Sequence, residues 1–320
     1  MSLNIYKPDV FQGNLDKKNY FEGWYYKHVS ADLKNVYSFI PGISLNDTDP
    51  HSFIQVLNGI TGESHYIPFP LSEFSWRADK LYIKIGKSVF TGDYMNLDLK
   101  TGNTRIAGTI EYQNVTKYPR RIFSPGIMGW YSFVPYMECK HEVVSVNHDL
   151  KGKLKVNETS IDFTNGKGYI EKDWGTSFPE AWLWIQANNF NDRATSFFFS
   201  VAKIPWRGKF FMGFIAFLYY NRKFYLFSTY NGSVIREVKR NGNSIFLELR
   251  NGKNIIRLNS AGKKSGELKA PVSGSMSRRI KESNDAIVSV ALYDKDNVVH
   301  YTDTSKRSGI ELIEKIFEYL

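Results

Sequence analysis

The stretch GYIEKDWGTSFPEAWLWIQAN, from Gly168 to Asn188, interleaves charged side chains with tryptophans. Alternate residues of a strand share one face, so Glu171 and Asp173 would lie side by side, with Lys172 on the opposite face. Repulsion between two such carboxylates, together with loss of water beside indole rings, favours the protonated form of one of them. The stretch therefore predicts a carboxylic acid that can donate a proton near neutral pH.

The second half of this stretch predicts a strand with an aromatic and amide face. One face carries Trp182, Trp184, Gln186 and Asn188, and the other carries Leu183, Ile185 and Ala187. Indole faces attract cations, so the rings that could stabilise a cationic intermediate are Trp24, Trp174, Trp182 and Trp184. Indoles that simply fill a core, with the amides bonded to the backbone, remain an alternative interpretation.

Two further stretches combine charge and aromatic rings in the same way. YFEGWYYK, from Tyr20 to Lys27, places on one strand face Glu22, Trp24 and Tyr26. GWYSFVPYMECKHEVVS, from Gly129 to Ser145, places His141 among apolar neighbours, with Glu138, Lys140 and Glu142 on the opposite face. An imidazole titrates near neutral pH, so His141 could accept the proton of a phenol, although a hydrogen-bonded core histidine is the alternative.

Because charge and indole interleave only in these three motifs, we expect them to meet in one cavity. The residues expected to converge there are Glu22, Trp24, His141, Asp173, Trp182 and Gln186.

Composition limits the classes of protein and site. The chain has 320 residues, 42% apolar, 23% charged and 16% aromatic, which is typical of a globular protein of about two domains rich in strands. Cys139 is the only cysteine, so an intrachain disulfide and a zinc site of several thiolates are excluded. The histidines never fall at metal-site spacing with a carboxylate, so no metal is expected.

The net charge of +10 points to anionic partners only weakly. The basic residues of the chain are scattered along the sequence, singly or in pairs. This distribution is typical of a solvated surface and argues against a nucleic-acid partner. The longest apolar run, residues 210–220, is too short to cross a bilayer as a helix. The first residues lack an apolar run typical of a signal peptide, so we expect a cytoplasmic protein, with a peripheral membrane contact as an open alternative.

Period-two alternation predicts an all-β fold. It is clear in residues 81–85, 95–99, 245–249 and 287–292, and Asn-Gly pairs at 231, 241 and 251 predict tight hairpins. Helical spacing appears at the end of the chain, behind Ser308, in Ile310, Ile313, Ile316, Phe317 and Leu320. We predict two antiparallel β-barrels, residues 1–177 and 178–320, and a short C-terminal α-helix.

The three motifs resemble the tocopherol cyclase family and its bacterial relatives, and more distantly carotenoid hydratases and lipocalin-like pericyclases. The resemblance implies two lipocalin-like β-barrels and closure of a chromanol ring on a prenylated hydroquinone, with no cofactor. It also implies a cavity for an apolar or prenylated small molecule. Asp173 departs from the family pattern, E-K-N-W-G, where an amide is expected, so the resemblance supports the fold more than the reaction.

The residues and the resemblance together favour an enzyme of the isomerase or lyase class, which cyclises, isomerises or hydrates a prenylated aromatic or terpenoid molecule by acid catalysis. The predicted catalytic residues are Asp173, Glu171 and His141. The predicted substrate contacts are Glu22, Trp24, Tyr26, Glu138, Trp174, Trp182, Trp184, Gln186 and Asn188. The alternative is a non-catalytic lipocalin-like carrier of an apolar molecule, which needs apolar walls but no protonated carboxyl group. Neither the substrate nor the oligomeric state is specified by the sequence.

Overall fold

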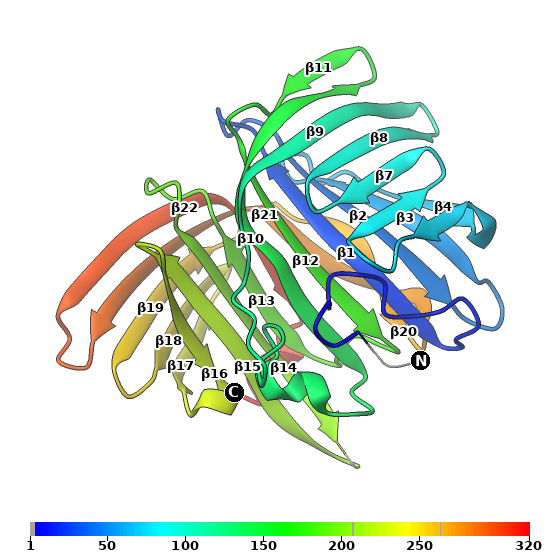
Figure 1. The fold of residues 1–320 in the computed structure, drawn as a ribbon. Helices are drawn as coiled ribbons and strands as arrows, with labels where there is room; N and C mark the ends of the chain where they lie inside the picture. Colours follow the sequence, from blue (N-terminus) through cyan, green and yellow to red (C-terminus); the bar gives the residue numbers. More distant parts are fainter. Residues whose placement is uncertain (1–3, 207, 263) are drawn as a thin grey trace. The chain divides into compact units, whose positions relative to one another are not determined.

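The structure is a computed structural model that describes residues 4–206, 208–262 and 264–320. The described chain is built almost wholly of antiparallel strands (Figure 1), which confirms the predicted all-β, lipocalin-like fold class. Its contacts group into two compact units. Unit 1 comprises the described residues of 1–58, 63–178 and 267–279, and unit 2 those of 59–62, 179–266 and 280–320.

Unit 1 contains a strongly curved sheet. Its strands are β1 (Tyr20–Val29), β2 (Val36–Leu45), β3 (His51–Asn58), β4 (Ser64–Pro70), β5 (Phe74–Trp76), β6 (Tyr82–Ile85), β7 (Ser88–Thr91), β8 (Tyr94–Thr101), β9 (Thr104–Thr116), β10 (Cys139–Val156), β11 (Thr159–Asp162) and β12 (Lys167–Gly175). The order across the sheet is β4-β3-β2-β1-β12-β10-β9-β8-β7-β6-β5, and β11 pairs with β10. Because β3 also contacts β6 near the other end of this order, the sheet is nearly closed into a barrel. Two short 3-10 helices, η1 (Leu71–Glu73) and η2 (Gly129–Phe133), lie in its loops.

The second sheet forms most of unit 2, but its residues 267–279 belong to unit 1. Its strands are β13 (Trp182–Ala187), β14 (Ser196–Trp206), β15 (Lys209–Tyr220), β16 (Lys223–Ser228), β17 (Val234–Asn241), β18 (Ser244–Arg250), β19 (Asn254–Ala261), β20 (Gly266–Val272), β21 (Ser275–Asp294) and β22 (Val299–Leu312). The order is β16-β15-β14-β13-β22-β21-β19-β18-β17, and β20 pairs with β21. The remaining elements are the 3-10 helices η3 (Thr229–Asn231) and η4 (Glu314–Glu318).

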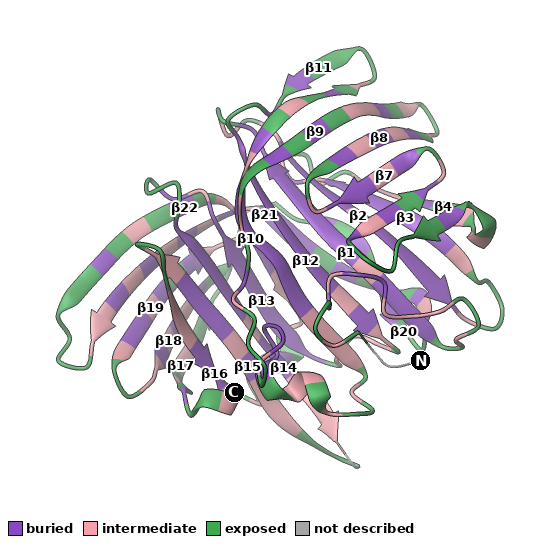
Figure 2. Ribbon diagram, viewed as in Figure 1, coloured by how far each residue is buried: buried purple, intermediate pink, exposed green. Residues whose placement is uncertain are grey.

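Each unit has its own apolar core, formed by the alternating positions of its strands. In unit 1 the predicted faces are buried, including Ile83, Ile85, Met95, Leu97 and Leu99. In unit 2 the buried faces include Leu183, Ile185, Ile245, Leu247 and Leu249. On strands β1 and β12 both faces are buried along nearly the whole length (Figure 2). A strand buried on both sides is where charged side chains need partners within the protein.

Two of the three predicted Asn-Gly turns join neighbouring strands. The pair at 241–242 connects β17 to β18, and the pair at 251–252 lies between β18 and β19. Gly242 has a φ of 57°, the left-handed conformation that such a turn requires. The third pair, at 231–232, instead ends η3, with Gly232 in the left-handed conformation.

The C-terminal segment forms a 3-10 helix rather than the predicted α-helix. Residues Ile310 and Leu312 still belong to β22, where they pair with β13, so only residues 314–318 remain for the helical segment η4. This segment is packed on the core of unit 2, because Ile316 is fully buried and the flanking Ile313 and Phe317 contact that core.

The hairpin of residues 267–279 belongs to unit 1, although it follows unit 2 strands in sequence. Gln55 exchanges two hydrogen bonds with the backbone of Lys269, at 3.0 and 2.8 Å. The hydroxyl of Ser44 donates to the carbonyl of Gly274 at 2.7 Å. The two units defined by contacts are therefore not separated by one boundary between residues 177 and 178.

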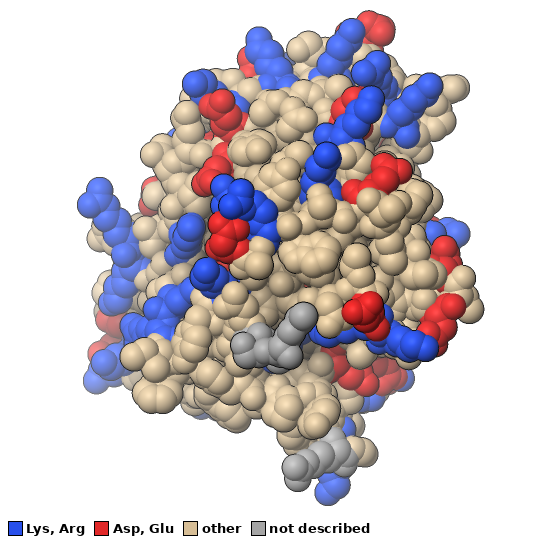
Figure 3. Space-filling model, turned by 45° about the vertical axis from the view of Figure 1, so that its right-hand side comes forward, with Lys and Arg blue, Asp and Glu red and all other residues tan. Residues whose placement is uncertain are grey.

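Basic side chains are scattered over the face seen in Figure 3, with acidic and uncharged side chains between them. This distribution agrees with the sequence, in which the basic residues do not cluster. Among the described residues, no helix has the length and apolar character needed to cross a lipid bilayer.

Candidate active site

The pairing of β12 with β10 and β1 divides the predicted site residues between two sides of one sheet. His141 lies opposite Asp173, and Glu142 lies opposite Lys172. On the other side of β12, Trp24 lies opposite Lys172. Since alternate residues point to opposite faces, one face carries Cys139, His141, Glu171 and Asp173. The other face, toward the core of unit 1, carries Glu22, Trp24, Lys140, Glu142, Lys172 and Trp174.

The three predicted catalytic residues lie together. The Nδ1 of His141 is 2.9 Å from Oδ1 of Asp173, and its Nε2 is 3.8 Å from Oε2 of Glu171. The hydroxyl of Tyr169 donates to the same Glu171 oxygen at 2.7 Å. The thiol of Cys139 lies 3.9 Å from Oδ1 of Asp173. The predicted shared face of Glu171 and Asp173 is therefore present, but a histidine lies between the two carboxylates.

This arrangement keeps His141 protonated. Burial by itself lowers the pKa of an imidazole, but the charge and hydrogen bond of Asp173, with the charge of Glu171, raise the pKa of His141 to about 9. The imidazole therefore carries its proton at neutral pH. In that state the side chain is a cationic hydrogen-bond donor, and a role for His141 in accepting a phenol proton stays a prediction.

The same three side chains offer a set of metal ligands. One ligand atom each from His141, Glu171 and Asp173 lies within 4.8 Å of the others. An imidazole with two carboxylates suits Zn²⁺, provided that the imidazole loses its proton. The spacing rule applied to the sequence did not detect this set, because its members come from two paired strands rather than from one segment.

The opposite face of the sheet holds a buried ion pair. The Nζ of Lys172 is 2.6 Å from Oε1 of Glu22, and both side chains are fully buried. The ammonium also donates to the carbonyls of Pro8 at 2.8 Å and Val10 at 2.5 Å. Burial lowers the pKa of Lys172, and the charge of Glu22 opposes this effect. We call residues 4–13 the strap, because this pair fastens them across unit 1.

Glu22 completes the attachment of the strap. Its carboxylate accepts hydrogen bonds from the backbone N–H groups of Gln12, at 2.9 Å, and Gly13, at 3.1 Å. It also accepts one from the hydroxyl of Tyr20 at 2.5 Å. Glu22, predicted as a substrate contact, therefore binds other parts of the chain.

The predicted aromatic residues Trp24 and Tyr26 belong to the core of unit 1. Trp24 is fully buried, and its Nε1 donates to the carbonyl of Asp9 at 3.0 Å. Tyr26 donates to the carbonyl of Thr91 at 3.1 Å. The ammonium of Lys172 lies 5.0 Å from the ring centre of Trp24 and 4.6 Å from that of Trp174. These two indoles thus lie beside the cation of a protein side chain, and their stabilising a cationic intermediate stays a prediction.

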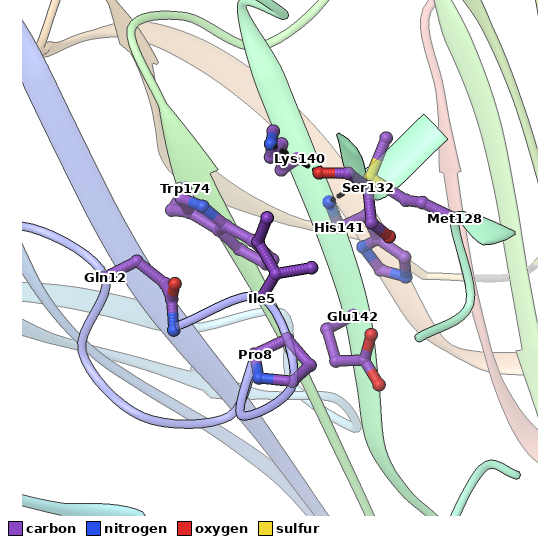
Figure 4. A pocket seen from close by; sticks show the side chains of 9 residues that line it. All are labelled: Ile5, Pro8, Gln12, Met128, Ser132, Lys140, His141, Glu142 and Trp174. Atoms are coloured by element: carbon purple, nitrogen blue, oxygen red, sulfur yellow. Dashed lines mark hydrogen bonds between the residues drawn. The ribbon is translucent and has the colours of Figure 1, made fainter. Parts of the chain in front are cut away.

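A small pocket lies between the strap, β10 and the loop before β10 (Figure 4). Its lining residues are Ile5, Pro8, Gln12, Met128, Ser132, Lys140, His141, Glu142 and Trp174. Glu22 and Trp24 are not among them. The pocket has room for a few water molecules, so a larger ligand requires the strap or the loop to move.

Glu142 is a titratable group of this pocket that was not predicted as a catalytic residue. Its side chain is almost fully buried, and burial raises its pKa to about 7. The charge of Arg120, 3.8 Å from Oε1, and the N–H of Ile127, 3.2 Å from Oε2, act in the opposite direction. A side chain at Gly126 would collide with this carboxyl group. Alternation alone assigned Glu142 to the same face as the exposed Glu138; only the pairing with β12 reveals its burial.

The remaining predicted residues belong to unit 2, except Glu138. Trp182, Trp184 and Gln186 are buried on the face of β13 opposite the core of unit 2, and Asn188 is buried just after the strand. The Nε1 of Trp182 donates to Glu311 at 3.1 Å. In unit 1, Glu138 is exposed. That the β13 residues share a cavity with residues of unit 1 stays a prediction.

Comparison with known proteins identifies the family. Residues 83–312 match the family model described as tocopherol cyclase-like. This chain belongs to the tocopherol cyclase-like family. The match includes β10, β12 and β13, and therefore His141, Glu142 and Asp173, whereas the strap and β1 lie outside it.

One plant relative and two solved structures are similar to this tocopherol cyclase-like chain. It is 26% identical over 110 residues to the "Probable tocopherol cyclase, chloroplastic" of Oryza sativa subsp. japonica. The aligned segment covers 33% of this chain and 23% of the rice protein. The crystal structure of CghA with Sch210972 has a TM-score of 0.55 at 9% identity, covering 92% of this chain and 88% of CghA. Kievitone hydratase from Nectria haematococca has a TM-score of 0.50 at 10% identity, covering 91% and 88%. At these identities the structures show a shared fold.

Proposed function

We propose that this tocopherol cyclase-like protein is an enzyme that transfers a proton to an alkene of a prenylated aromatic or terpenoid molecule and thereby closes a ring or adds water. The observation that carries the proposal is Glu142, a buried carboxyl group with a pKa raised to about 7 that lines a pocket beside the indole of Trp174. A carboxylic acid that is half protonated near neutral pH matches the task of a general acid.

Glu142 can serve as acid and then as base. Its proton passes to one alkene carbon, and a tertiary cation forms on the other. The oxygen of a phenol, or of water, attacks that cation, and the new C–O bond forms as the O–H proton returns to the Glu142 carboxylate. In total, one C–H bond and one C–O bond form, while one O–H bond and one alkene π bond break. No redox partner is therefore required.

The other residues around the pocket have supporting roles in this proposal. The indole of Trp174 lines the pocket and can stabilise the cation. The imidazolium of His141 is among the residues that line the pocket, and Asp173 holds it protonated and in place. Asp173 and Glu171, predicted as candidate acids, are positioning residues here.

The test uses deuterium to follow the proton. The protein is incubated in D₂O with a panel of prenylated hydroquinones and linear terpenoid alcohols, and products are analysed by mass spectrometry and NMR. We expect an isomer or hydrate with deuterium on the former alkene carbon. Glu142→Gln should lower turnover by about 10²-fold to 10⁴-fold. The matched control, Glu158→Gln, changes a carboxylate whose side chain is 93% exposed and should leave turnover unchanged.

Two results would contradict the proposal. If folded Glu142→Gln retains full turnover, another group is the acid. If the wild-type protein binds these compounds but returns them unchanged and without deuterium, the protein is a carrier, which is the alternative that the sequence left open.

A further inference from the structure

The loop between β9 and β10, residues 117–138, exposes apolar side chains to an unusual extent. We call it the aromatic loop. Tyr136 is 95% exposed, Phe123 82% and Ile122 72%, and Trp130 and Phe133 are also exposed. Groups of exposed apolar side chains commonly mark a site of binding to a protein or a membrane. A 22-residue connection within a compact unit is also longer than most, and such loops are commonly functional.

Part of this exposed apolar surface, at Ile122 and Phe133, contacts Tyr6 of the strap. The hydroxyl of Tyr6 donates to the carbonyl of Ile122 at 3.2 Å. The rings of Tyr6 and Phe133 meet edge to face, with their centres 6.3 Å apart. The surface also includes the indole of Trp130, which stacks on the ring of Tyr131 at 4.2 Å. Tyr6 is itself 56% exposed, so the apolar surface extends across both segments.

The charge of this surface is positive. The aromatic loop contains three basic residues, Lys117, Arg120 and Arg121, against one acidic residue, Glu138. Lys117 and Arg121 are exposed and form no ion pair within the described part of the chain. The protein as a whole carries a net charge of +10. Exposed aromatic rings beside basic side chains complement an anionic lipid surface, in which the rings enter the headgroup layer and the cations meet phosphates.

A second copy of this chain fits the surface less well. Two such loops face to face would bring like charges together, with one glutamate each to offset them. An anionic bilayer supplies both the apolar layer and the opposite charge.

The loop also forms part of the pocket. Met128 and Ser132 line it, and the carbonyl of Ser132 accepts a hydrogen bond from Lys140 at 2.9 Å. Arg120 contacts Glu142. A segment that inserts into lipid would therefore adjoin the entrance through which an apolar substrate reaches Glu142.

We propose that the aromatic loop docks this protein on the surface of an anionic lipid bilayer, through Ile122, Phe123 and Tyr136, with Lys117 and Arg121 contacting lipid phosphates. The docking rests on the exposed surface alone; the delivery of substrate from the bilayer rests additionally on the proposed function.

The test measures cosedimentation with vesicles and requires no substrate. The probes are vesicles of phosphatidylcholine alone and vesicles of equal parts phosphatidylcholine and phosphatidylglycerol. We expect binding to the anionic vesicles that weakens as salt increases. In the triple variant Ile122→Ser, Phe123→Ser, Tyr136→Ser, the affinity for these vesicles should fall by about tenfold or more. A matched control, Val298→Ser with Val299→Ser, removes two other exposed apolar side chains, 56% and 52% exposed, and should bind as the wild type does.

Equal vesicle binding by the triple variant and the wild type, or no binding by the wild type, overturns the proposal. So does a change from dimer to monomer in light scattering of the triple variant, which would make the surface a contact between copies. Turnover of substrate dispersed in detergent separates the two proposals. If the triple variant keeps its turnover but loses vesicle binding, the docking proposal is supported. Loss of turnover in Glu142→Gln tests the proposed function alone.

Discussion

Three histidines of unit 1 are held in opposite protonation states. Burial lowers the pKa of His28 to about 3, and burial lowers that of His148 well below its ordinary value. Both imidazoles meet neutral partners, since Nε2 of His28 lies 2.9 Å from the hydroxyl of Tyr112 and Nδ1 of His148 lies 2.8 Å from that of Ser145. His141, between two carboxylates, has a pKa raised to about 9. The difference follows from the neighbours, because His28 and His148 are buried, His141 is partly buried, and loss of water by itself lowers the pKa of all three.

These values predict stability that declines on both sides of about pH 6.5. The folded pKa of His28 is depressed, so its contribution is present above the unfolded value of 6.5 and is lost as pH falls toward 3. The full loss is roughly 5 kcal/mol. The folded pKa of His141 is raised, so its contribution is present below 6.5 and is lost as pH rises through 9. Urea unfolding at a series of pH values measures both limbs. His141→Asn should flatten the alkaline limb alone, and an unchanged alkaline limb would contradict the assignment.

The charge on His141 depends on Asp173. In Asp173→Asn the pKa of His141 should fall toward its ordinary value, because the amide supplies no negative charge. NMR titration of the imidazole measures this change. Asp162→Asn, in an exposed carboxylate, is the control and should leave the pKa of His141 where it is. A raised pKa that persists in Asp173→Asn would show that Glu171 is the dominant partner.

At the scale of elements, the strap depends on a pair of charges that water does not reach. Removing one partner leaves the other buried without compensation, which costs about 3 to 5 kcal/mol. We therefore expect Glu22→Gln and Lys172→Met each to lower the free energy of unfolding by about that amount, and hydrogen exchange at Gln12 and Gly13 to accelerate.

The matched control for this prediction is Lys151→Met. Lys151 faces Glu111 at 3.8 Å in a pair whose side chains are more than half exposed, and such a pair contributes about 1 kcal/mol at most. If the buried and exposed variants lose similar stability, the strap is not fastened by the Glu22 and Lys172 pair.

How far the elements follow from the sequence depends on whether a pattern is local. Alternation is a local property, so the faces of residues 83–85, 95–99 and 245–249 were predictable. The partner of a strand is not local. β12 pairs with β1, roughly 150 positions earlier, and with β10, and this pairing decides which carboxylates are buried.

The candidate site shows the same limit. His141 and Asp173 were both selected from their residue types and lie close together. The direction of the pKa shift of His141 could not be predicted, because it depends on the distances to two carboxylates. Glu142 was not selected because its neighbours come from the loop before β10. Pairing of Ile310 with Ile185 likewise overrode the helical spacing at the C-terminus.

At the scale of the whole chain, unit 1 requires the hairpin of residues 267–279. We expect Gln55→Ala to lower the free energy of unfolding by about 1 to 3 kcal/mol, because it leaves the N–H and carbonyl of Lys269 without their partners. Hydrogen exchange at the amide of Lys269 should accelerate. Asn96→Ala, which removes an exposed side-chain hydrogen bond to Thr109 at 2.7 Å, is the control and should have a smaller effect. Unchanged protection at Lys269 in Gln55→Ala would contradict the role of this contact.

The fastening of the strap by Lys172 has a consequence for biosynthesis. Translation adds residues from the N-terminus at roughly 5 to 20 per second, so Glu22 is made roughly 10 to 30 seconds before the lysine that neutralises it. Through that interval β1 has one edge without its neighbour β12, and its aromatic side chains are available to other nascent chains. Unit 1 can complete its contacts only after residues 267–279 have been made as well. The nascent chain is therefore a long-lived substrate for chaperones, and slowing its translation would favour aggregation over folding.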